Sequence, residues 1–456
     1  MNPPAKAGLV LRGDRPWDAG WISGAGTVLE DGGRYRLWYT ALPEVARFED
    51  DRFRLCYAES NDGVRWRKPN LGLYEWRGSK ANNILMETSI ENAGGVFVDP
   101  KAPLTGRYKL LAILNRQFSP PEGNGLYVYQ SPDGLHWTLH PKRVFPFVPD
   151  TVNMAFFDAR LRKYVAYLRV WDPLRKVGRV ETDDILAPWP YDRDARPSRT
   201  WNTDTPPPSR EIPTAFGYDE RDPAPSDHYT SAVVQYPWAD NAYFMFPSAY
   251  LHYPPPPKSP YRNDGPLDIQ LAVSRDGVRF ERVERAPYIG LGPAGSGDGG
   301  SLYMYIGMLR RDGDIFQYYG GVEHTHGAYQ GYSRISGVGG AFRVVQRLDG
   351  FVSVDAAMAG GAFHTPPLRF AGTRLAVNVD ASAMGEVKIE LQDQAGSPLS
   401  GFGFDACDPI HGNHLEQTVT WAGRSELGRL AGQSVGDEVH FQLPIKRNGA
   451  QKYGCA

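Results

Sequence analysis

The phrase Ser60-Asn61-Asp62-Gly63-Val64-Arg65-Trp66 returns twice along the chain, as Ser131-Pro132-Asp133-Gly134-Leu135-His136-Trp137 and as Ser274-Arg275-Asp276-Gly277-Val278-Arg279-Phe280. Its Asp-Gly pair favours a tight hairpin turn, because glycine adopts a positive φ without steric cost. The serine and aspartate side chains can accept hydrogen bonds from the turn amides, and the aromatic residue beyond the turn can pack between neighbouring sheets. These aspartates are therefore predicted to mark the fold and not to catalyse.

The spacing of the copies predicts the number of repeat units. The first two copies begin 71 residues apart and the last two begin 143 apart, which is close to two periods. A degenerate unit is expected between them at residues 181–189, and a weaker echo runs from Tyr332 to Phe342. Five units in about 330 residues are typical of a five-bladed β-propeller.

Each unit also contains two short apolar runs separated by a turn, which is a hairpin signal. These runs are 27–29 with 35–39, 96–98 with 108–111, 155–157 with 164–167, 232–234 with 243–246, and 302–306 with 315–319. After Asp349 the repeat stops, but apolar residues still alternate at 375/377/379, 387/389/391 and 439/441/443. This alternation favours an antiparallel sandwich. The expected fold is all-β, with a five-bladed β-propeller over residues 1–348 and a β-sandwich over residues 349–456.

Composition supports this fold class and excludes several functions. The 456 residues include 50 Gly, 38 Pro and 56 aromatic residues, which leaves little room for long helices. The net charge is −2 with no basic tract, so nucleic acid is not expected as a partner. No apolar run approaches the roughly 20 residues of a membrane span. The three cysteines form no CxxC pair, so neither a disulfide framework nor a structural zinc site is expected.

Two properties stay open at this stage. The first residues, MNPPAKAGLVLRGDRPWD, contain no long apolar segment of the signal-peptide kind. Either the protein stays in the cytoplasm or a signal was removed, and the sequence does not decide between them. The oligomeric state is also undetermined.

Two segments carry a resemblance to a known superfamily. They are Tyr57-Ala58-Glu59-Ser60-Asn61-Asp62-Gly63, with Trp66 and Pro69-Asn70-Leu71-Gly72, and Gly350-Phe351-Val352-Ser353-Val354-Asp355-Ala356. Together with the five units and the sandwich, they resemble the propeller glycoside hydrolases of families 32, 43 and 68, the invertase, levanase and arabinanase group. The resemblance implies hydrolysis of a furanoside or related glycan by carboxylates, with a carbohydrate as partner and no cofactor.

The chain departs from this group at the first inner strand. Invertase-like enzymes carry an Asn-Asp-Pro phrase there, and this chain has Ile22-Ser23-Gly24-Ala25-Gly26-Thr27. The nearest acid is Asp18. A non-catalytic carbohydrate-binding propeller is therefore the main alternative, and an intracellular scaffold is a third reading.

Propeller geometry predicts where a site would form. The innermost strand of each blade begins at one rim of the central channel, and the next strand ends at the same rim. Polar and aromatic residues at these places are candidates to bind a sugar, since rings stack on sugar faces. They are Trp17, Trp21, Asn92, Asn153, Trp171, His228, Tyr229, Asp298, His324 and His326, and the polar segment 261–268 before a strand of the fourth unit adds Arg262 and Asp264.

A glycosidase needs two carboxylates, one to protonate the leaving oxygen and one to attack or to activate water. Asp150 and Asp227 precede the third and fourth inner strands and are the first candidates, with Asp18, Glu91 or Glu323 as a third acid. Each of them can instead brace a loop. His324 and His326 share one strand face, but no third ligand is evident, so no metal site is expected.

Overall fold

The structure is a computed structural model of the chain. It describes residues 1–47, 50–88, 92–150, 152–192, 208–239, 241–253, 264–328, 333–357, 359–365, 370, 372–393, 395–428, 430, 445–448 and 451–454. These ranges contain no α-helix, and their helical turns are the 3₁₀ segments η2 (Asn92–Gly95), η3 (Leu104–Gly106) and η4 (Arg116–Phe118). No helix in them is long and apolar enough to cross a membrane. The fold is all-β, as predicted.

The chain forms two compact units. The larger unit comprises Pro3–Arg311 and Ile315–Val345. The smaller unit comprises Met1–Asn2, Asp312–Asp314 and Gln346–Ala456. The predicted boundary between residues 348 and 349 stays a prediction.

Four separate four-stranded sheets follow one another in the larger unit. The first holds β2 (Trp21–Asp31), β3 (Arg34–Leu42), β4 (Phe53–Ser60) and β5 (Ile84–Thr88), and the second holds β6 (Val96–Val98), β7 (Tyr108–Leu114), β8 (Gly125–Ser131) and β9 (Thr138–Leu139). The third holds β10 (Met154–Asp158), β11 (Lys163–Trp171), β12 (Arg175–Thr182) and β13 (Thr214–Phe216). The fourth holds β15 (Val233–Gln235), β16 (Tyr243–Met245), β19 (Ala272–Ser274) and β20 (Glu281–Arg282).

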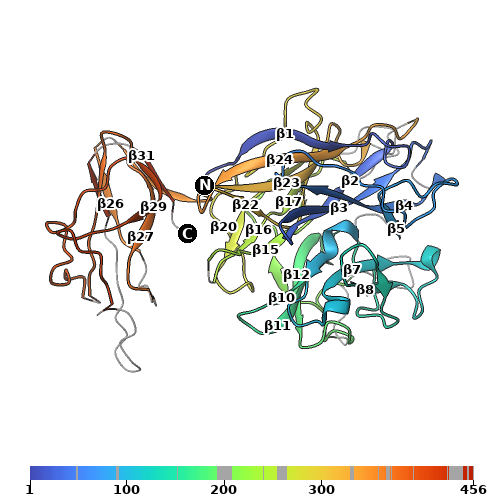
Figure 1. The fold of residues 1–456 in the computed structure, drawn as a ribbon, viewed down its shortest axis with the longest axis horizontal. Helices are drawn as coiled ribbons and strands as arrows, with labels where there is room; N and C mark the ends of the chain where they lie inside the picture. The colour runs from blue at the N-terminus through green and yellow to red at the C-terminus, as the bar shows by residue number, and fades with distance from the viewer. Residues whose placement is uncertain are drawn as a thin grey trace. The chain divides into compact units, whose positions relative to one another are not determined.

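The strands of the last repeat unit belong to a larger sheet. This eight-stranded sheet runs in the order β1 (Ala5–Arg12), β24 (Gly340–Arg347), β23 (Asp314–Val322), β21 (Ser301–Met304), β18 (Leu267–Ile269), β17 (Ser248–Leu251) and β14 (Ser226–His228), and β22 (Leu309–Arg311) pairs with β23. The sheets are arranged around the unit in chain order, as in a propeller (Figure 1). The count of four-stranded blades is four and not the predicted five, because β21, β23 and β24 share a sheet with β14, β17 and β18.

Each repeated phrase forms the turn that its residues predict. Ser60 Oγ accepts a hydrogen bond from the Gly63 amide at 2.9 Å, and Asp62 Oδ1 accepts from the amides of Val64 and Arg65 at 2.9 and 2.8 Å. The other two copies repeat these contacts. The carboxylates are thus occupied by turn amides, in agreement with their predicted structural role.

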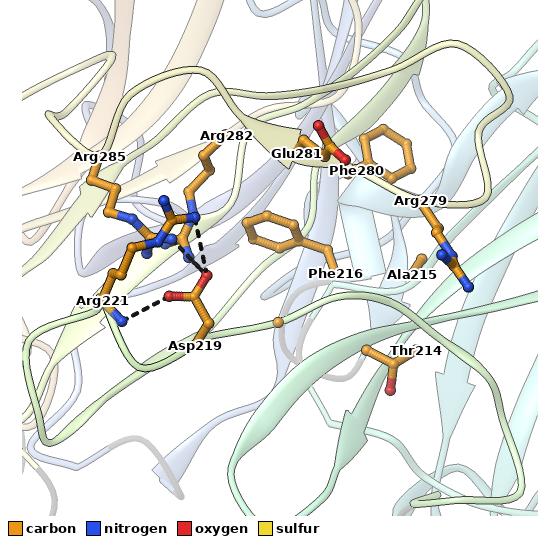
Figure 2. Close-up of a pocket in the computed structure, with 11 residues that line it drawn as sticks. Thr214, Ala215, Phe216, Asp219, Arg221, Arg279, Phe280, Glu281, Arg282 and Arg285 are labelled. Carbon is orange, nitrogen blue, oxygen red and sulfur yellow. Dashed lines mark hydrogen bonds and ion pairs between the residues drawn. The ribbon is translucent and has the colours of Figure 1, made fainter.

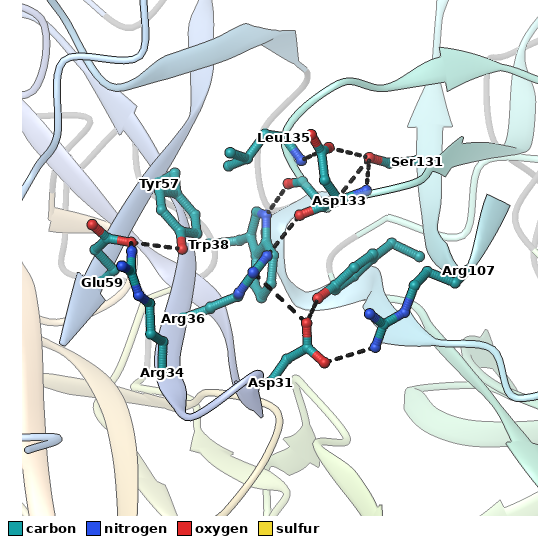
Figure 3. Close-up of polar contacts among 12 residues, drawn as sticks. Asp31, Arg34, Arg36, Trp38, Tyr57, Glu59, Arg107, Ser131, Asp133 and Leu135 are labelled. Carbon is teal, nitrogen blue, oxygen red and sulfur yellow. Dashed lines mark hydrogen bonds and ion pairs between the residues drawn. The ribbon is translucent and has the colours of Figure 1, made fainter. Parts of the chain in front are cut away.

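The turns also join neighbouring sheets. Trp38 of β3 donates its indole N–H to the carbonyl of Gly134 at 2.8 Å, so the turn after β8 is fixed to the preceding sheet (Figure 3). Tyr167 of β11 makes the equivalent bond to Gly277 at 2.6 Å. The aromatic residue after the turn packs there too, since Phe280 lies edge-on to Tyr167 with ring centroids 5.8 Å apart. This confirms the predicted packing between sheets.

In the described residues, the turn of the degenerate unit at 181–189 accepts no such bond from the second sheet, and the sequence explains why. Tyr35 of β3 pairs with Ser60, and Tyr108 of β7 pairs with Ser131. Trp38 and Leu111 each lie three residues after these tyrosines. Leu111 therefore occupies in β7 the position that Trp38 occupies in β3. Leucine has no donor to offer. The turn that follows β12 has Ile185 where the other copies have glycine, while its Asp184 still accepts from the Leu186 amide at 2.9 Å.

The core of the larger unit lies mainly between adjacent sheets. One cluster, for example, combines Leu111 and Val128 of the second sheet with Ala166 and Leu168 of the third, and Trp189 closes it. This is the burial that alternating strands provide when both faces of a sheet are covered.

The smaller unit contains two sheets. One has the order β25 (Ser353–Ala356), β31 (Gln451–Gly454), β27 (Ala376–Asp380) and β29 (Asn413–Thr418), and the other β26 (Gly361–Phe363), β30 (Ile445–Asn448) and β28 (Glu386–Ile389). Val379, Val387, Ile389 and Trp421 are buried in one cluster. The predicted alternation at 439/441/443 lies outside the described residues. A β-sandwich here stays a prediction.

Candidate functional site

Arg169, near the end of β11, is the centre of a polar cluster in the larger unit. Its side chain is 2% exposed, whereas that of Asp150, just before β10, is 53% exposed. Arg169 Nη1 donates to Asp150 Oδ2 at 2.5 Å, and its Nη2 donates to the carbonyl of Tyr229. A buried guanidinium therefore holds a carboxylate whose remaining surface is open to solvent.

The backbone at Asp150 is unusual. Asp150 has φ +67°, a left-handed conformation that costs free energy for most residues but is tolerated by Asp and Asn. Asn153 supports the turn, since its Nδ2 donates to the Asp150 carbonyl at 3.1 Å and its Oδ1 accepts from the Arg169 amide at 3.4 Å. Strained backbone of this kind is frequent at functional sites.

A second arginine holds Asp227 nearby. Arg175 at the start of β12 pairs in register with Trp171, and its Nη1 lies 3.0 Å from Asp227 Oδ2. His252 Nε2 lies 3.3 Å from the other oxygen, and the carboxyl group itself is fully buried. Burial alone would raise the pKa of Asp227, but the His252 hydrogen bond and the Arg175 charge outweigh it and lower the pKa. Asp227 is therefore ionised and orients Arg175.

An aromatic ring lies against the guanidinium group of each arginine. The Arg169 guanidinium lies 4.1 Å from the ring centroid of Tyr229, and that of Arg175 lies 4.3 Å from Trp171. His326 packs against Tyr229 in a tilted arrangement with centroids 4.3 Å apart and shares a 2.6 Å hydrogen bond through Nδ1 with the Tyr303 hydroxyl. Burial, followed by the charges of Arg175 and Arg169, lowers the pKa of His326 to about 3, so its ring is neutral.

Two further predicted residues adjoin this cluster. Asp264 accepts hydrogen bonds from Thr325 Oγ1 at 3.0 Å and from the Gly327 amide at 2.8 Å, so it holds the segment that carries His326. Trp21 packs in the same apolar cluster as Tyr229 and Tyr303. We call the group of Asp150, Arg169, Arg175, Asp227, Tyr229 and His326, with Trp171 and Tyr303, the arginine cluster. It unites Asp150, Asp227, Trp171, Tyr229 and His326 from the prediction.

Trp17, Asp18 and Asn92 make other contacts. Asp18 is buried and pairs with Lys68 at 2.6 Å, while Tyr39 donates to it at 3.0 Å. The Trp17 indole donates to Asn83 Oδ1 at 2.7 Å. Asn92 exchanges two hydrogen bonds with the Ile113 backbone at 2.9 and 3.1 Å. These contacts brace the fold.

Asp298, Glu323 and His324 lie at another place. Asp298 is buried and accepts from Lys6 at 2.6 Å and from Tyr319 at 2.7 Å. Glu323 accepts from the amides of Gly295 and Gly297 at 2.7 Å each, and these bonds lower its pKa. Glu323 and the exposed His324 line a cavity of about 500 Å³ whose residues do not include those of the arginine cluster.

His228 differs from its neighbour Asp227. It is 3% exposed and packs against Phe216 with ring centroids 4.7 Å apart. Consecutive residues of a strand point to opposite faces, so β14 directs Asp227 to the arginine cluster and His228 away from it. Glu91 and Arg262 lie outside the described residues.

Sequence reasoning missed Arg175 and Tyr303. The predicted rim positions were the starts of first strands and the ends of second strands. The hairpin from Trp171 to Arg175 shows that third strands begin at the same rim. Including third-strand starts would have found Arg175. Tyr303 lies within an apolar run of an inner strand, and its residue type alone does not indicate a functional site.

Within the described residues, no group of three or more His, Cys, Asp or Glu side chains is placed to hold a metal ion. The chemistry available in the arginine cluster is that of carboxylates, guanidinium groups and aromatic rings.

Comparisons with known proteins give structural likenesses only. No family model and no curated protein matches the sequence. Solved structures that align with the chain are glycan-active proteins. An N-acetylgalactosamine deacetylase from F. plautii is 14% identical over 76% of this chain and 94% of its own, with a TM-score of 0.48. A glycosyl hydrolase from Bacteroides ovatus is 14% identical over 75% and 90%, with a TM-score of 0.45.

A third is a structure of the GH130 family of mannoside phosphorylases, which contains glycoside hydrolases that target β-1,2-mannosidic linkages in Candida mannan. It is 14% identical over 76% of this chain and 90% of its own, with a TM-score of 0.42. At these TM-scores, below 0.5, the likenesses establish neither the fold nor the activity of this chain.

Proposed function

We propose that this chain is a glycosidase that acts on a glycan at the arginine cluster. The observation that carries the proposal is Asp150, a half-exposed carboxylate held at 2.5 Å by the buried Arg169, whose guanidinium lies 4.1 Å from the Tyr229 ring centroid. Carboxylates perform the chemistry of glycosidases, and aromatic faces bind sugar rings.

The contacts favour particular roles. A half-exposed carboxylate held in a fixed orientation suits a nucleophile or a base. Asp150 would take that role. Asp227 is fully buried and would act as a positioning residue that holds Arg175. Tyr229 and Trp171 are buried, at 9% and 2% exposed, and would hold the two arginines in place.

Among the remaining predicted acids, Asp18 pairs with Lys68 and Glu323 lines another cavity, so the proton donor is proposed to be Glu91. Glu91→Gln tests this role, and Asp18→Asn and Glu323→Gln are the comparison variants. The donor variant should lose activity toward substrates with poor leaving groups and keep activity toward aryl glycosides with acidic phenols, because such phenolates leave without protonation.

A non-catalytic carbohydrate-binding protein is the second candidate, and one observation favours it. Asp150 is the only exposed carboxylate among the described residues of the arginine cluster, since Asp227 is buried. A binding protein needs no second carboxylate, whereas hydrolysis does.

A substrate screen separates the two candidates. Purified protein is incubated with aryl furanosides, aryl pyranosides and fructans, and released sugar is measured together with binding. Furanosides come first because of the resemblance to furanosidases. Turnover of any substrate supports the glycosidase, whereas binding without turnover across the screen supports the binding protein.

We also propose that the eight-stranded sheet serves as the fifth unit of the propeller and that the two sheets of the smaller unit form a sandwich. Tyr318 of β23 donates to the carbonyl of Gly63 at 2.5 Å, which repeats the bond between neighbouring sheets. The shared burial of Val379 and Ile389 supports the sandwich. An experimental structure tests both.

A further inference from the structure

A cavity of about 520 Å³ lies between β13 and β20, apart from the arginine cluster (Figure 2). This volume is in the range of sites that hold small molecules. Phe216 lies at its centre and Phe280 beside it, with Arg221, Arg282 and Arg285 on one side and Arg279 on the other (Figure 2). We call it the β13–β20 cavity.

Two of its arginines are fixed by ion pairs. Arg282 and Arg285 each lie 2.6 Å from Asp222, and Arg285 also lies 2.6 Å from Asp219. The Arg282 side chain is 4% exposed, and its guanidinium lies 5.3 Å from the Phe216 ring centroid. Burial would raise the pKa of Asp222, but the bonds to Arg282 dominate and lower the pKa to about 2. The network keeps these groups charged and in place.

His228 packs against Phe216, a residue that lines the cavity, and so supports it. Its ring packs on Phe216 at 4.7 Å, and neither of its ring nitrogens has a hydrogen-bond partner among the described residues. The aromatic surface that faces the cavity is therefore rigidly supported.

Arg279 departs from the pattern of the repeated turn. At the equivalent place in the first copy, Arg65 Nε donates back to Asp62 at 2.8 Å, and in the second copy His136 contacts Asp133 at 2.7 Å. Within the described part of the chain, the Arg279 guanidinium has no hydrogen-bond or ion-pair partner of this kind. It lines the β13–β20 cavity instead.

We propose that the β13–β20 cavity is a second glycan-binding site that takes a sugar residue carrying a carboxylate or a sulfate group. The lining has four guanidinium groups against the carboxylates of Asp219 and Glu281, and Asp222 beside it pairs with two of the four, so one positive charge is left over to favour an anion. Phe216 and Phe280 are 5% and 7% exposed, so they form a small apolar part of the lining and the guanidinium groups provide the binding. Arg279 binds the anionic group, because guanidinium pairs with carboxylate and sulfate oxygens through two parallel N–H bonds.

This inference rests on the proposed function in one respect, namely that the ligand is a glycan. Binding is measured by isothermal titration calorimetry with tetragalacturonate, a sulfated carrageenan tetrasaccharide that carries no carboxylate, and neutral maltotetraose. The protein carries Asp150→Asn so that no turnover disturbs the measurement. Carboxylate and sulfate ligands are distinguished by which of the first two probes binds.

Arg279→Gln is compared with Arg275→Gln, a matched control in the same turn whose side chain does not line the cavity. Affinity for an acidic probe should be about tenfold weaker in Arg279→Gln than in the Asp150→Asn parent, unchanged in Arg275→Gln, and lower as salt rises. Maltotetraose should bind much more weakly. Thermal unfolding of both variants checks that they fold.

Failure to bind either acidic probe, or equal affinity in Arg279→Gln, would overturn the proposal. The two proposals fail separately. If the chain hydrolyses no glycan, Arg279-dependent binding can still be observed, and if the cavity binds nothing, turnover of aryl glycosides by Arg279→Gln is unaffected.

Discussion

The hydroxyl of Tyr318 donates a hydrogen bond of 2.5 Å to the carbonyl of Gly63, a residue 255 positions earlier in the chain. Trp66 of the same turn lies edge-on to the Tyr318 ring with centroids 5.5 Å apart. These contacts join the last repeat unit to the first. The hydrogen bond is of the same kind as the bond from Trp38 to Gly134, which joins the first two sheets. One repeated phrase thus provides both the turn and the connection between sheets.

Substitution of Gly63 by Ala should destabilise the protein by about 2 kcal/mol or more. Gly63 has φ +69°, which costs other residues about 1 kcal/mol or more, and a Cβ would lie 2.8 Å from the Tyr318 hydroxyl. Tyr318→Phe should cost about 1 kcal/mol, because the Gly63 carbonyl loses its donor. Urea unfolding measures both losses.

Gly32→Ala is the matched control for Gly63→Ala. Gly32 also has a positive φ, +62°, but a Cβ there would meet nothing within 4 Å. Its loss should therefore reflect backbone strain alone and be smaller. Equal losses at Gly32 and Gly63 would show that the contact between sheets contributes nothing.

Asp268→Asn should stabilise the protein at pH 8 and have no effect near pH 4. Asp268 Oδ1 is buried without a partner among the described residues, and burial raises the pKa of this carboxyl group to about 6. The unfolded chain ionises near 3.9. Ionisation therefore opposes folding increasingly as pH rises from about 4 to about 6, and the penalty stays constant above that, at roughly 3 kcal/mol.

Chemical unfolding of wild type and Asp268→Asn across pH 4–8 measures this difference. Asp183→Asn, at an exposed position, is the control and should run parallel to wild type. A constant difference between Asp268→Asn and wild type over the whole pH range would contradict the assignment.

Asp227→Asn should destabilise the protein by about 3 kcal/mol at pH 7, because Arg175 loses the counter-charge of a buried ion pair. The pKa of Asp227 is lowered in the folded state, so its contribution is present above the unfolded value near 3.9 and is lost as pH falls. The difference from wild type should shrink in acid. Asp172→Asn, which removes an exposed pair with Arg210, should cost far less.

The hairpins and turns could be predicted because their chemistry is local. Asp62 and Gly63 favour a turn through their own chemistry, and the apolar runs 27–29 and 35–39 of the same unit lie in β2 and β3. The eight-stranded sheet could not be predicted this way. It depends on which distant strands pair, such as the parallel contact between Leu267 and Ser301, and no local pattern encodes that.

The candidate site was predicted in part for the same reason. Asp150 and Tyr229 precede inner strands and were found by position. Arg175 was missed because only two of the strands that reach the rim were searched. The burial of Asp18 against Lys68 depends on a contact 50 residues away, which a list of rim acids cannot reveal.

The most direct test of the central claim is the turnover number of Asp150→Asn on the best substrate of the screen. Asparagine accepts the left-handed backbone at this position and keeps the size of the side chain, so the variant should fold and still bind sugar. Asp349→Asn, at φ +56° in the smaller unit, is the matched control. The account predicts that kcat falls by about 10²–10⁴-fold in Asp150→Asn and is unchanged in Asp349→Asn. Wild-type turnover by folded Asp150→Asn would contradict it.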